Sequence, residues 1–113
     1  MTPTPCRAER IRELNDAFRA GGASMGRWMI TRGVAALAAE FVALAVQSVR
    51  DFDRFDADDD PWGEHDFGAF DLVGERPIWK IDYYDPSLSH GSANPADPAV
   101  TARVLTVMLP EEY

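Results

Sequence analysis

Cysteine is nearly absent from this chain, which has Cys6 alone among its 113 residues. One thiol cannot form an internal disulfide, and one chain cannot assemble a cysteine-based zinc site from it. Cys6 precedes a predicted helix and has no histidine near it in the sequence, so we expect a bystander thiol rather than a catalytic nucleophile. A chain without disulfides suits a reducing cytoplasm.

Long apolar runs are also missing. The most apolar stretch, residues 34–46, includes Glu40 and is shorter than the roughly 20 residues that span a bilayer. The first twelve residues lack a basic segment followed by an apolar one, so no secretion signal is expected. We therefore expect a cytoplasmic protein without a membrane anchor.

Basic residues are scarce in one segment, and this is the most informative feature of the composition. Residues 51–75 contain ten acidic side chains against Arg54 alone, within a chain of net charge −8. Nucleic-acid affinity depends on cations that displace counterions from phosphates, so an acidic chain is a poor direct ligand for DNA or RNA. We therefore expect a partner protein with a basic surface and no direct nucleic-acid contact.

The length and composition predict one domain covering residues 1–113. Hydrophobic residues make up 46% and charged residues 27% of the chain, which is typical of a globular protein. Apolar residues at helical spacing predict two helices, the first ending at Gly21-Gly22 and the second covering residues 34–55. Their predicted buried faces carry Ile11, Leu14 and Phe18 in the first helix and Leu37, Phe41, Leu44, Ser48 or Val49, Phe52 and Phe55 in the second.

Strands are predicted over residues 27–31, 67–73, 78–84 and 100–109. Gly74-Glu75 is a plausible tight turn, with Pro77 near the start of the strand that follows. In that strand the predicted faces are Trp79, Ile81 and Tyr83 on one side and Ile78, Lys80, Asp82 and Tyr84 on the other. Residues 86–99 form a loop rich in Pro, Ser, Gly and Asn. The order helix, strand, helix, strand, strand, strand predicts an α+β fold with two helices packed on a small, mostly antiparallel sheet of about four strands.

Five stretches, in chain order, carry a family resemblance: IRELNDAFR, ITRGV, GEHDFGAF, WKIDYYD and DPAVTARVLTVMLPEEY. In this order and at compatible spacing they are similar to the bacterial domain-of-unknown-function family 3768, small proteins often found on plasmids and other mobile DNA. The resemblance implies no activity, catalytic residue or cofactor. The association with mobile DNA favours a role in defence, counter-defence or transfer.

The stretch FDADDDPWGEHDFGAF, residues 55–70, concentrates six carboxylates. A calcium-binding EF-hand loop starting at Asp56 would place Pro61 where the sharp turn needs glycine, and Phe67 where the closing glutamate belongs. That motif therefore fails. No metal or cofactor is expected, although a weak cation site remains an alternative among Asp58, Asp59, Asp60 and Glu64.

The triplet Asp66-Phe67-Gly68 resembles the magnesium-binding triplet of protein kinases. The kinase chemistry also requires a glycine-rich phosphate loop, a strand lysine and a catalytic loop, which a chain of 113 residues does not contain. We interpret the triplet as coincidental.

An enzymatic alternative is a small metal-dependent hydrolase in which His65 acts as base or metal ligand. Its acidic partners would be Glu64, Asp66, Asp82 and Asp85. The second histidine, His90, lies in a different loop, whereas a pair of histidines at helical spacing would be strong evidence. We therefore expect no enzymatic function, with His65 hydrogen-bonded where the loop meets a strand and His90 solvated.

The function predicted from these patterns is protein binding through a carboxylate-rich surface. Clustered carboxylates can imitate phosphates and compete for a nucleic-acid channel, so the most concrete hypothesis is an inhibitor of a nucleic-acid-binding defence protein, of the anti-CRISPR or anti-restriction type. The predicted binding residues are Asp56, Asp58, Asp59, Asp60, Trp62, Glu64 and Asp66.

The three tryptophans are expected to differ in role. Trp28 and Trp79 alternate within strands and are expected in the core, whereas Trp62 is either tucked under the acidic loop or offered to a partner. A third alternative is a homodimeric or accessory subunit, which would show an exposed apolar patch or an unpaired edge strand at residues 100–109.

Overall fold

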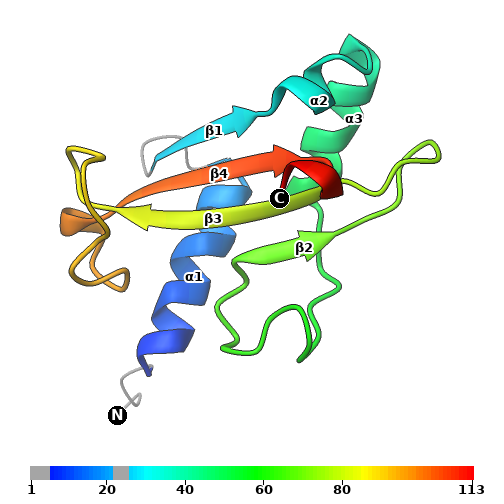
Figure 1. Cartoon of the computed structure of the whole chain (residues 1–113). Helices are drawn as coiled ribbons and strands as arrows, with labels where there is room; N and C mark the ends of the chain where they lie inside the picture. Colours follow the sequence, from blue (N-terminus) through cyan, green and yellow to red (C-terminus); the bar gives the residue numbers. More distant parts are fainter. Residues whose placement is uncertain (1–5, 22–25) are drawn as a thin grey trace.

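A computed structural model describes residues 6–21 and 26–113 of the chain. Its helices and strands, in chain order (Figure 1), are α1 (Arg7–Arg19), β1 (Gly26–Ile30), α2 (Arg32–Ala35), α3 (Ala39–Arg50), β2 (Phe67–Ala69), β3 (Ile78–Tyr84) and β4 (Ala102–Met108). Two short 3-10 turns, η2 (Pro98–Val100) and η3 (Pro110–Glu112), flank β4.

The four strands form one mixed sheet in the order β1-β4-β3-β2. Strand β4 runs parallel to β1 and antiparallel to β3, and β3 runs antiparallel to β2. The helices lie on one face of this sheet, where α1 crosses behind β3 and β4 in Figure 1. The predicted α+β fold with a mostly antiparallel sheet is confirmed, and the opposite face of the sheet carries no helix among the described residues.

The core lies between the helices and the covered face of the sheet. Helix α1 buries Ile11, Leu14 and Phe18, as its spacing predicted, and ends at Arg19. Gly21, which follows, has a φ of +127°, a conformation that favours glycine, whereas Gly22 lies outside the described residues. Trp79 is fully buried in β3, and Trp28 is partly buried against Phe18.

The second predicted helix is wrong in its extent. The chain forms the short α2, leaves the helical conformation before Ala38, and then forms the longer α3, which ends at Arg50. Because this break rotates the helix relative to a continuous one, Leu37 and Leu44 are exposed, and the buried line of α3 is Phe41, Ala45 and Val49.

Tertiary contacts end α3 before Phe52 and Phe55. Arg19 of α1 donates hydrogen bonds to the carbonyl oxygens of Val49 at 2.9 Å and Phe52 at 2.7 Å, and so satisfies groups that a helix end leaves free. Phe52 and Phe55 then pack edge-on against Trp79, with ring centroids 5.5 and 6.1 Å away. Both phenylalanines join the core from the loop rather than from the helix.

The β2–β3 connection is a hairpin whose turn is one residue earlier than predicted. Leu72 and Glu75 exchange two backbone hydrogen bonds of 3.0 Å around Val73-Gly74, and both turn residues have a positive φ. This geometry matches a two-residue turn of the type that suits the twist of hairpin strands. Pro77 is buried directly before β3, as expected.

Strand β4 is central rather than at an edge. It pairs with β1 on one side and with β3 on the other, which contradicts the hypothesis of an unpaired edge strand at residues 100–109. Residues 86–99 form the predicted loop with turns. Within the described ranges, every helix is too short or too polar to cross a lipid bilayer.

Candidate functional site

The acidic loop, residues 51–66, connects α3 to β2 and is held by its own side chains. The Oδ1 atom of Asp56 accepts hydrogen bonds from the backbone amides of Asp58 at 3.0 Å and Asp59 at 2.9 Å. This is an Asx-type turn, in which a short carboxylate replaces a backbone acceptor. It directs the side chains of Asp58 and Asp59 into solvent, where both residues are exposed.

Asp60 is the inner support of the loop. Only 8% of the residue is exposed, and its Oδ1 accepts the backbone amides of Glu64 at 3.0 Å and His65 at 3.1 Å. Hydrogen bonds to an ionised acceptor are among the stronger ones in proteins. The carboxylate therefore closes residues 60–65 into a compact turn, in which Gly63 and His65 both have positive φ values.

His65 lies where the loop meets α1, and its ring has contacts on several sides. Its Nδ1 is 2.9 Å from Asp16 Oδ1, its Nε2 is 3.9 Å from Asp60 Oδ2, and the ring stacks on Phe55 at 3.7 Å. Asp16 Oδ1 also accepts from Arg19 at 3.0 Å. His65 is therefore hydrogen-bonded, as the sequence predicted, but the partner of its ring lies on α1 rather than at the junction with the strand.

The hydrolase alternative named different neighbours for His65. The carboxylates in contact with the ring are Asp16 and Asp60, and neither was among the expected partners. The side chain of Asp85 serves another loop, where hydrogen bonds from Ser87 and two backbone amides lower the pKa of that carboxyl. His90 is exposed, as predicted.

A buried polar chain fastens the loop to the sheet. Arg103, which is 1% exposed, donates from Nε to Asn15 Oδ1 at 2.7 Å. The Nδ2 of Asn15 donates to Tyr83 Oη at 2.8 Å and to the carbonyl of Glu64 at 3.0 Å. Tyr83 in turn donates to Glu64 Oε1 at 2.9 Å. Burial lowers the pKa of Arg103 and raises the pKa of Tyr83 well above its usual range.

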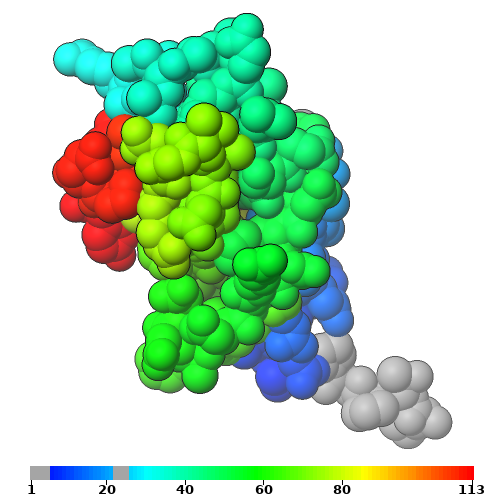
Figure 2. All heavy atoms as spheres, turned by 90° about the vertical axis from the view of Figure 1, so that its right-hand side faces the viewer, coloured from blue at the N-terminus to red at the C-terminus, as the bar shows by residue number. Residues whose placement is uncertain are grey.

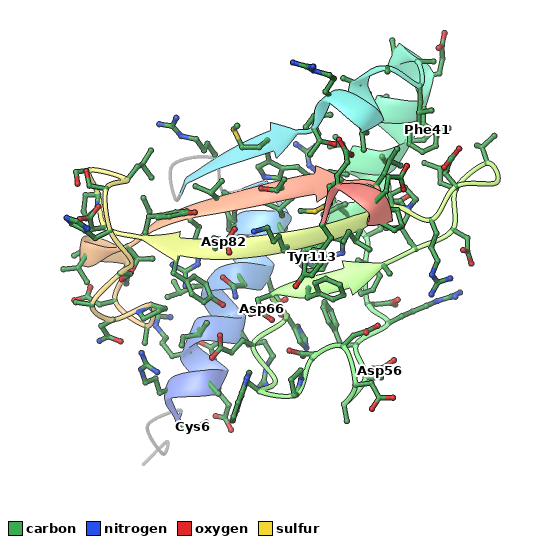
Figure 3. All side chains as sticks on the ribbon, in the orientation of Figure 1. Cys6, Phe41, Asp56, Asp66, Asp82 and Tyr113 are labelled. Carbon is green, nitrogen blue, oxygen red and sulfur yellow. The ribbon has the colours of Figure 1, made fainter. Side chains whose placement is uncertain are left out.

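Asp66 is partly buried beside these groups. Burial first, and then the negative charges of Glu64, Asp60 and Asp82, raise the pKa of Asp66 to about 6. The carbonyl oxygen of Asp66 accepts the backbone amide of Ile81 at 2.9 Å, which places Asp66 beside the part of β3 that carries Asp82. Figure 3 labels Asp66 beside β2 and Asp56 on the outer part of the acidic loop.

The structure thus divides the seven predicted binding residues into two groups. Asp60, Glu64 and Asp66 point inward or take part in internal contacts, and Asp56 is exposed but holds a turn. Asp58, Asp59 and Trp62 are exposed, and Trp62 is 77% accessible. We call these three residues the outward set.

A groove of about 580 Å³ reaches the outward set at Asp59, which lines it. It lies between α3, the acidic loop and the β2–β3 hairpin, which Figure 2 shows side by side on one face of the molecule. Arg54 and Arg76 also line it, and Arg76 pairs with Asp71 at 3.0 Å. The groove is acidic overall, because its lining includes Asp51, Asp53, Asp56, Asp59 and Asp71.

No metal-ligand cluster is present in residues 6–21 and 26–113, in the sense of three or more His, Cys, Asp or Glu side chains placed to hold one ion. The weak cation site considered among Asp58, Asp59, Asp60 and Glu64 is therefore not assembled. Asp60 turns inward to backbone amides, while Asp58 and Asp59 are exposed on the other side of the turn.

The comparison with known families gives one match. Residues 30–112 match the model of the family described as "Protein of unknown function (DUF3768)". The chain belongs to the DUF3768 family. No curated protein and no solved structure gives a significant match.

The DUF3768 match is narrower than the resemblance seen in the sequence, since it begins at Ile30 and leaves out α1. The acidic loop, Tyr83 and Arg103 lie inside the matched range, whereas Asn15 and Asp16 lie before it. The site of this DUF3768 member thus combines residues from both parts of the chain.

Four residues of the site were missed in the sequence: Asn15, Asp16, Tyr83 and Arg103. Arg103 carried a usable signal, because it alternates with Leu105 and Val107 on the covered face of β4. A charged residue at a core position is rare unless it is paired. Asn15 carried a similar signal, because it stands four residues after Ile11 and three before Phe18, at the spacing of the predicted buried face.

Proposed function

We propose that this DUF3768 chain is a protein-binding module that receives a positively charged segment of a partner on the outward set and the adjoining groove. The observation that carries the proposal is the exposure of Asp58, Asp59 and Trp62 on a loop whose Asp56, Asp60 and Glu64 hold the backbone in place. A large aromatic side chain in solvent next to carboxylates suits recognition of a basic surface.

The fixed shape of the loop also supports binding. Ordering a flexible loop costs about 0.5–1.5 kcal/mol per immobilised side chain, which subtracts from affinity. Here Asp60 and His65 already fix the turn in the free protein. The net charge of −8 adds long-range attraction toward a basic partner and accelerates encounter.

The most concrete version of this proposal is an inhibitor of a nucleic-acid-binding defence protein, of the anti-CRISPR or anti-restriction type. Its support is the small size, the acidic surface and the resemblance to proteins carried on mobile DNA. In this version the outward carboxylates occupy the channel that a nuclease uses for phosphates.

The first experiment measures binding of a labelled arginine- and lysine-rich peptide by fluorescence anisotropy of the label, at low and high salt. Asp58→Asn with Asp59→Asn should weaken binding about tenfold at low salt and less at high salt, because exposed charges contribute roughly 0.2–1 kcal/mol each and are screened by ions. Trp62→Ala should cost about 2 kcal/mol, the effect of a buried aromatic anchor.

A matched control separates local recognition from net charge. Glu9→Gln with Glu111→Gln removes the same two charges from exposed positions outside the loop and should leave the affinity nearly unchanged. Equal losses in both double variants would mean that only the overall charge acts, and the proposed surface would be wrong. Asp60 is left intact, because its loss would disturb the loop itself.

The inhibitor version needs its own assay. A panel of restriction and CRISPR nucleases is incubated with the protein, and cleavage of plasmid DNA is measured. Inhibition by the wild type, weakened in the Asp58→Asn and Asp59→Asn double variant, is the expected result. Peptide binding without inhibition of any nuclease in the panel would keep the binding module and remove the inhibitor proposal for those enzymes.

A further inference from the structure

The face of the sheet opposite the helices is exposed on β1 and partly exposed on β2, β3 and β4. Two rows of paired residues cross it: Met29, Thr106, Lys80 and Phe67 form one, and Arg27, Val104 and Asp82 the other. A hollow of about 540 Å³ lies between these rows and the C-terminal turn η3. Figure 3 shows Asp82 and Tyr113 on this face, turned away from α1. We call it the open face.

The open face has both apolar and charged side chains. Met29 is 50% exposed and Tyr113 79% exposed, and Tyr113 packs edge-on against Phe67 of β2 at 6.1 Å. Val104, which is partly exposed, and the buried Met108 also line the hollow. Contiguous exposed apolar side chains with polar neighbours mark interaction sites in soluble proteins.

The charges of the open face balance, in contrast to the rest of this acidic chain. Arg27 and Lys80 are positive, Asp82 and Glu112 are negative, and the whole chain carries −8. The carboxylate of Glu112 is used within the molecule, since it accepts hydrogen bonds from Thr31 Oγ1 and two backbone amides. A nearly neutral face is the part of such a chain that can meet a like-charged copy without strong repulsion.

Lys80 is the only lysine of the sequence and lies near the middle of the open face. Its Nζ is 2.8 Å from Asp82 Oδ2, and both side chains are about one-third exposed, at 37% and 36%. The two residues stand two positions apart on the same strand, so they project from the same face. They form a small patch of opposite charges side by side.

We propose that a second copy of this chain covers the open face, with a two-fold axis that passes between Lys80 and Asp82. A two-fold axis brings the same patch of both copies together, so residue i meets residue j and j meets i. The Lys80 of each copy then faces the Asp82 of the other. The apolar side chains of Met29 and Tyr113 lie around these pairs and exclude water from them. This dimer is independent of the proposed function of the acidic loop.

The size of the open face sets the expected strength of the dimer. The strands β1, β4, β3 and β2 have 5, 7, 7 and 3 residues, which at about 3.3 Å per residue and 4.8 Å between strands gives a flat face of roughly 350 Å² per copy. Two such faces amount to about 700 Å² in total, which is below the roughly 1,200–2,000 Å² of stable specific interfaces and fits a weak, transient dimer. The expected dissociation constant is therefore micromolar rather than nanomolar.

The test uses charge reversal in two complementary variants. Lys80→Glu makes the patch doubly negative, and Asp82→Lys makes it doubly positive, so neither should pair with itself. An equimolar mixture should form a heterodimer, because each patch now meets its opposite. Molar mass is measured by light scattering after size exclusion, over about 10–300 µM, a range that brackets the expected affinity.

The wild type and a matched control complete the experiment. The wild type should be dimeric at the upper concentrations, and so should Arg76→Glu, which reverses a charge in the surface pair with Asp71 away from the open face. A monomeric wild type would overturn the proposal, as would single variants at positions 80 and 82 that remain dimeric. A mixture that stays monomeric, although both variants show wild-type circular dichroism, would overturn it too.

A second measurement needs no substitution. An amine-specific cross-linker followed by peptide mass spectrometry should join Lys80 of one copy to Lys80 of the other, because the chain has one lysine. Dimers linked only through amino-terminal amines would place the contact elsewhere and contradict the open-face dimer. A wild type that remains monomeric alone, but binds another macromolecule through this face, would assign the face to a different occupant.

Discussion

Replacing Asp60 by alanine tests whether the acidic loop is a folded element. Asp60 Oδ1 accepts two backbone amides, from Glu64 and His65, and the residue is only 8% exposed. Hydrogen bonds to a charged acceptor contribute roughly 1.5–3 kcal/mol each, and part of this is recovered when water reaches the amides. We expect Asp60→Ala to lower the free energy of unfolding by about 3 kcal/mol.

The matched control is Asp58→Ala in the same loop. Asp58 is exposed, and its side chain has no hydrogen bond within the described residues, so its loss should change stability by less than about 0.5 kcal/mol. Asp60→Asn is an intermediate case, because the amide oxygen still accepts the two backbone amides without a full charge. From the most to the least stable, the expected order is Asp58→Ala, Asp60→Asn and Asp60→Ala.

Urea unfolding followed by circular dichroism gives these free energies. Because a change of 1 kcal/mol shifts Tm by roughly 4 °C in a domain of this size, Asp60→Ala should also lower Tm by about 10 °C. Equal stabilities of Asp60→Ala and Asp58→Ala would refute the inward role of Asp60. The acidic loop would then be a solvated segment without internal structure.

Three further outcomes follow from the same contacts. The pKa of Asp66 is raised to about 6, so the folded state holds a proton more tightly than the unfolded chain, and the free energy of unfolding falls as pH rises from about 4 to 6. Asp66→Asn should flatten this dependence and stabilise the protein at pH 7 by about 1–2 kcal/mol, as measured by urea unfolding across this pH range. Gly68→Ala should lower the free energy of unfolding by roughly 1–3 kcal/mol through overpacking, because the added Cβ would lie 2.5 Å from the Trp79 indole nitrogen. Gly91→Ala is the control, since the nearest atom to its added Cβ is 3.9 Å away, and equal Tm values of the two variants would contradict the packing at Gly68. Arg103→Met should destabilise the protein by about 3 kcal/mol in thermal unfolding, because it leaves the buried Oδ1 acceptor of Asn15 unpaired. A loss below about 0.5 kcal/mol would mean that the buried polar chain contributes nothing to stability.

The sequence predicted the elements whose periodicity agrees with their burial. The spacing of Ile11, Leu14 and Phe18 correctly predicted the buried face of α1, and the alternation in β3 placed Trp79 and Ile81 in the core. The extent of the second helix could not be predicted from periodicity. Its end depends on hydrogen bonds from Arg19, a residue 30 positions before Val49.

The orientation of the acids could not be predicted for a similar reason. Asp58, Asp59 and Asp60 are consecutive in the sequence, yet the first two are exposed and the third is buried. Their directions follow from backbone turns at Asp56, Gly63 and His65, and composition does not encode such turns. The sequence therefore located the acidic segment, and the structure shows which of its side chains are exposed.

The acidic loop and the buried arginine are best understood together. Arg103 has no direct carboxylate partner within the described residues, and an unpaired charge in the core is costly. Asn15 and Tyr83 connect it to the carboxylate of Glu64 in the loop, so the electrostatic balance of the core depends on the loop remaining docked. The inward acids thereby fix the direction in which Asp58, Asp59 and Trp62 face. A partner that binds this outward set would meet a surface whose shape is set by the hydrogen bonds of the core, which is why substitutions at Asn15 should affect both stability and binding.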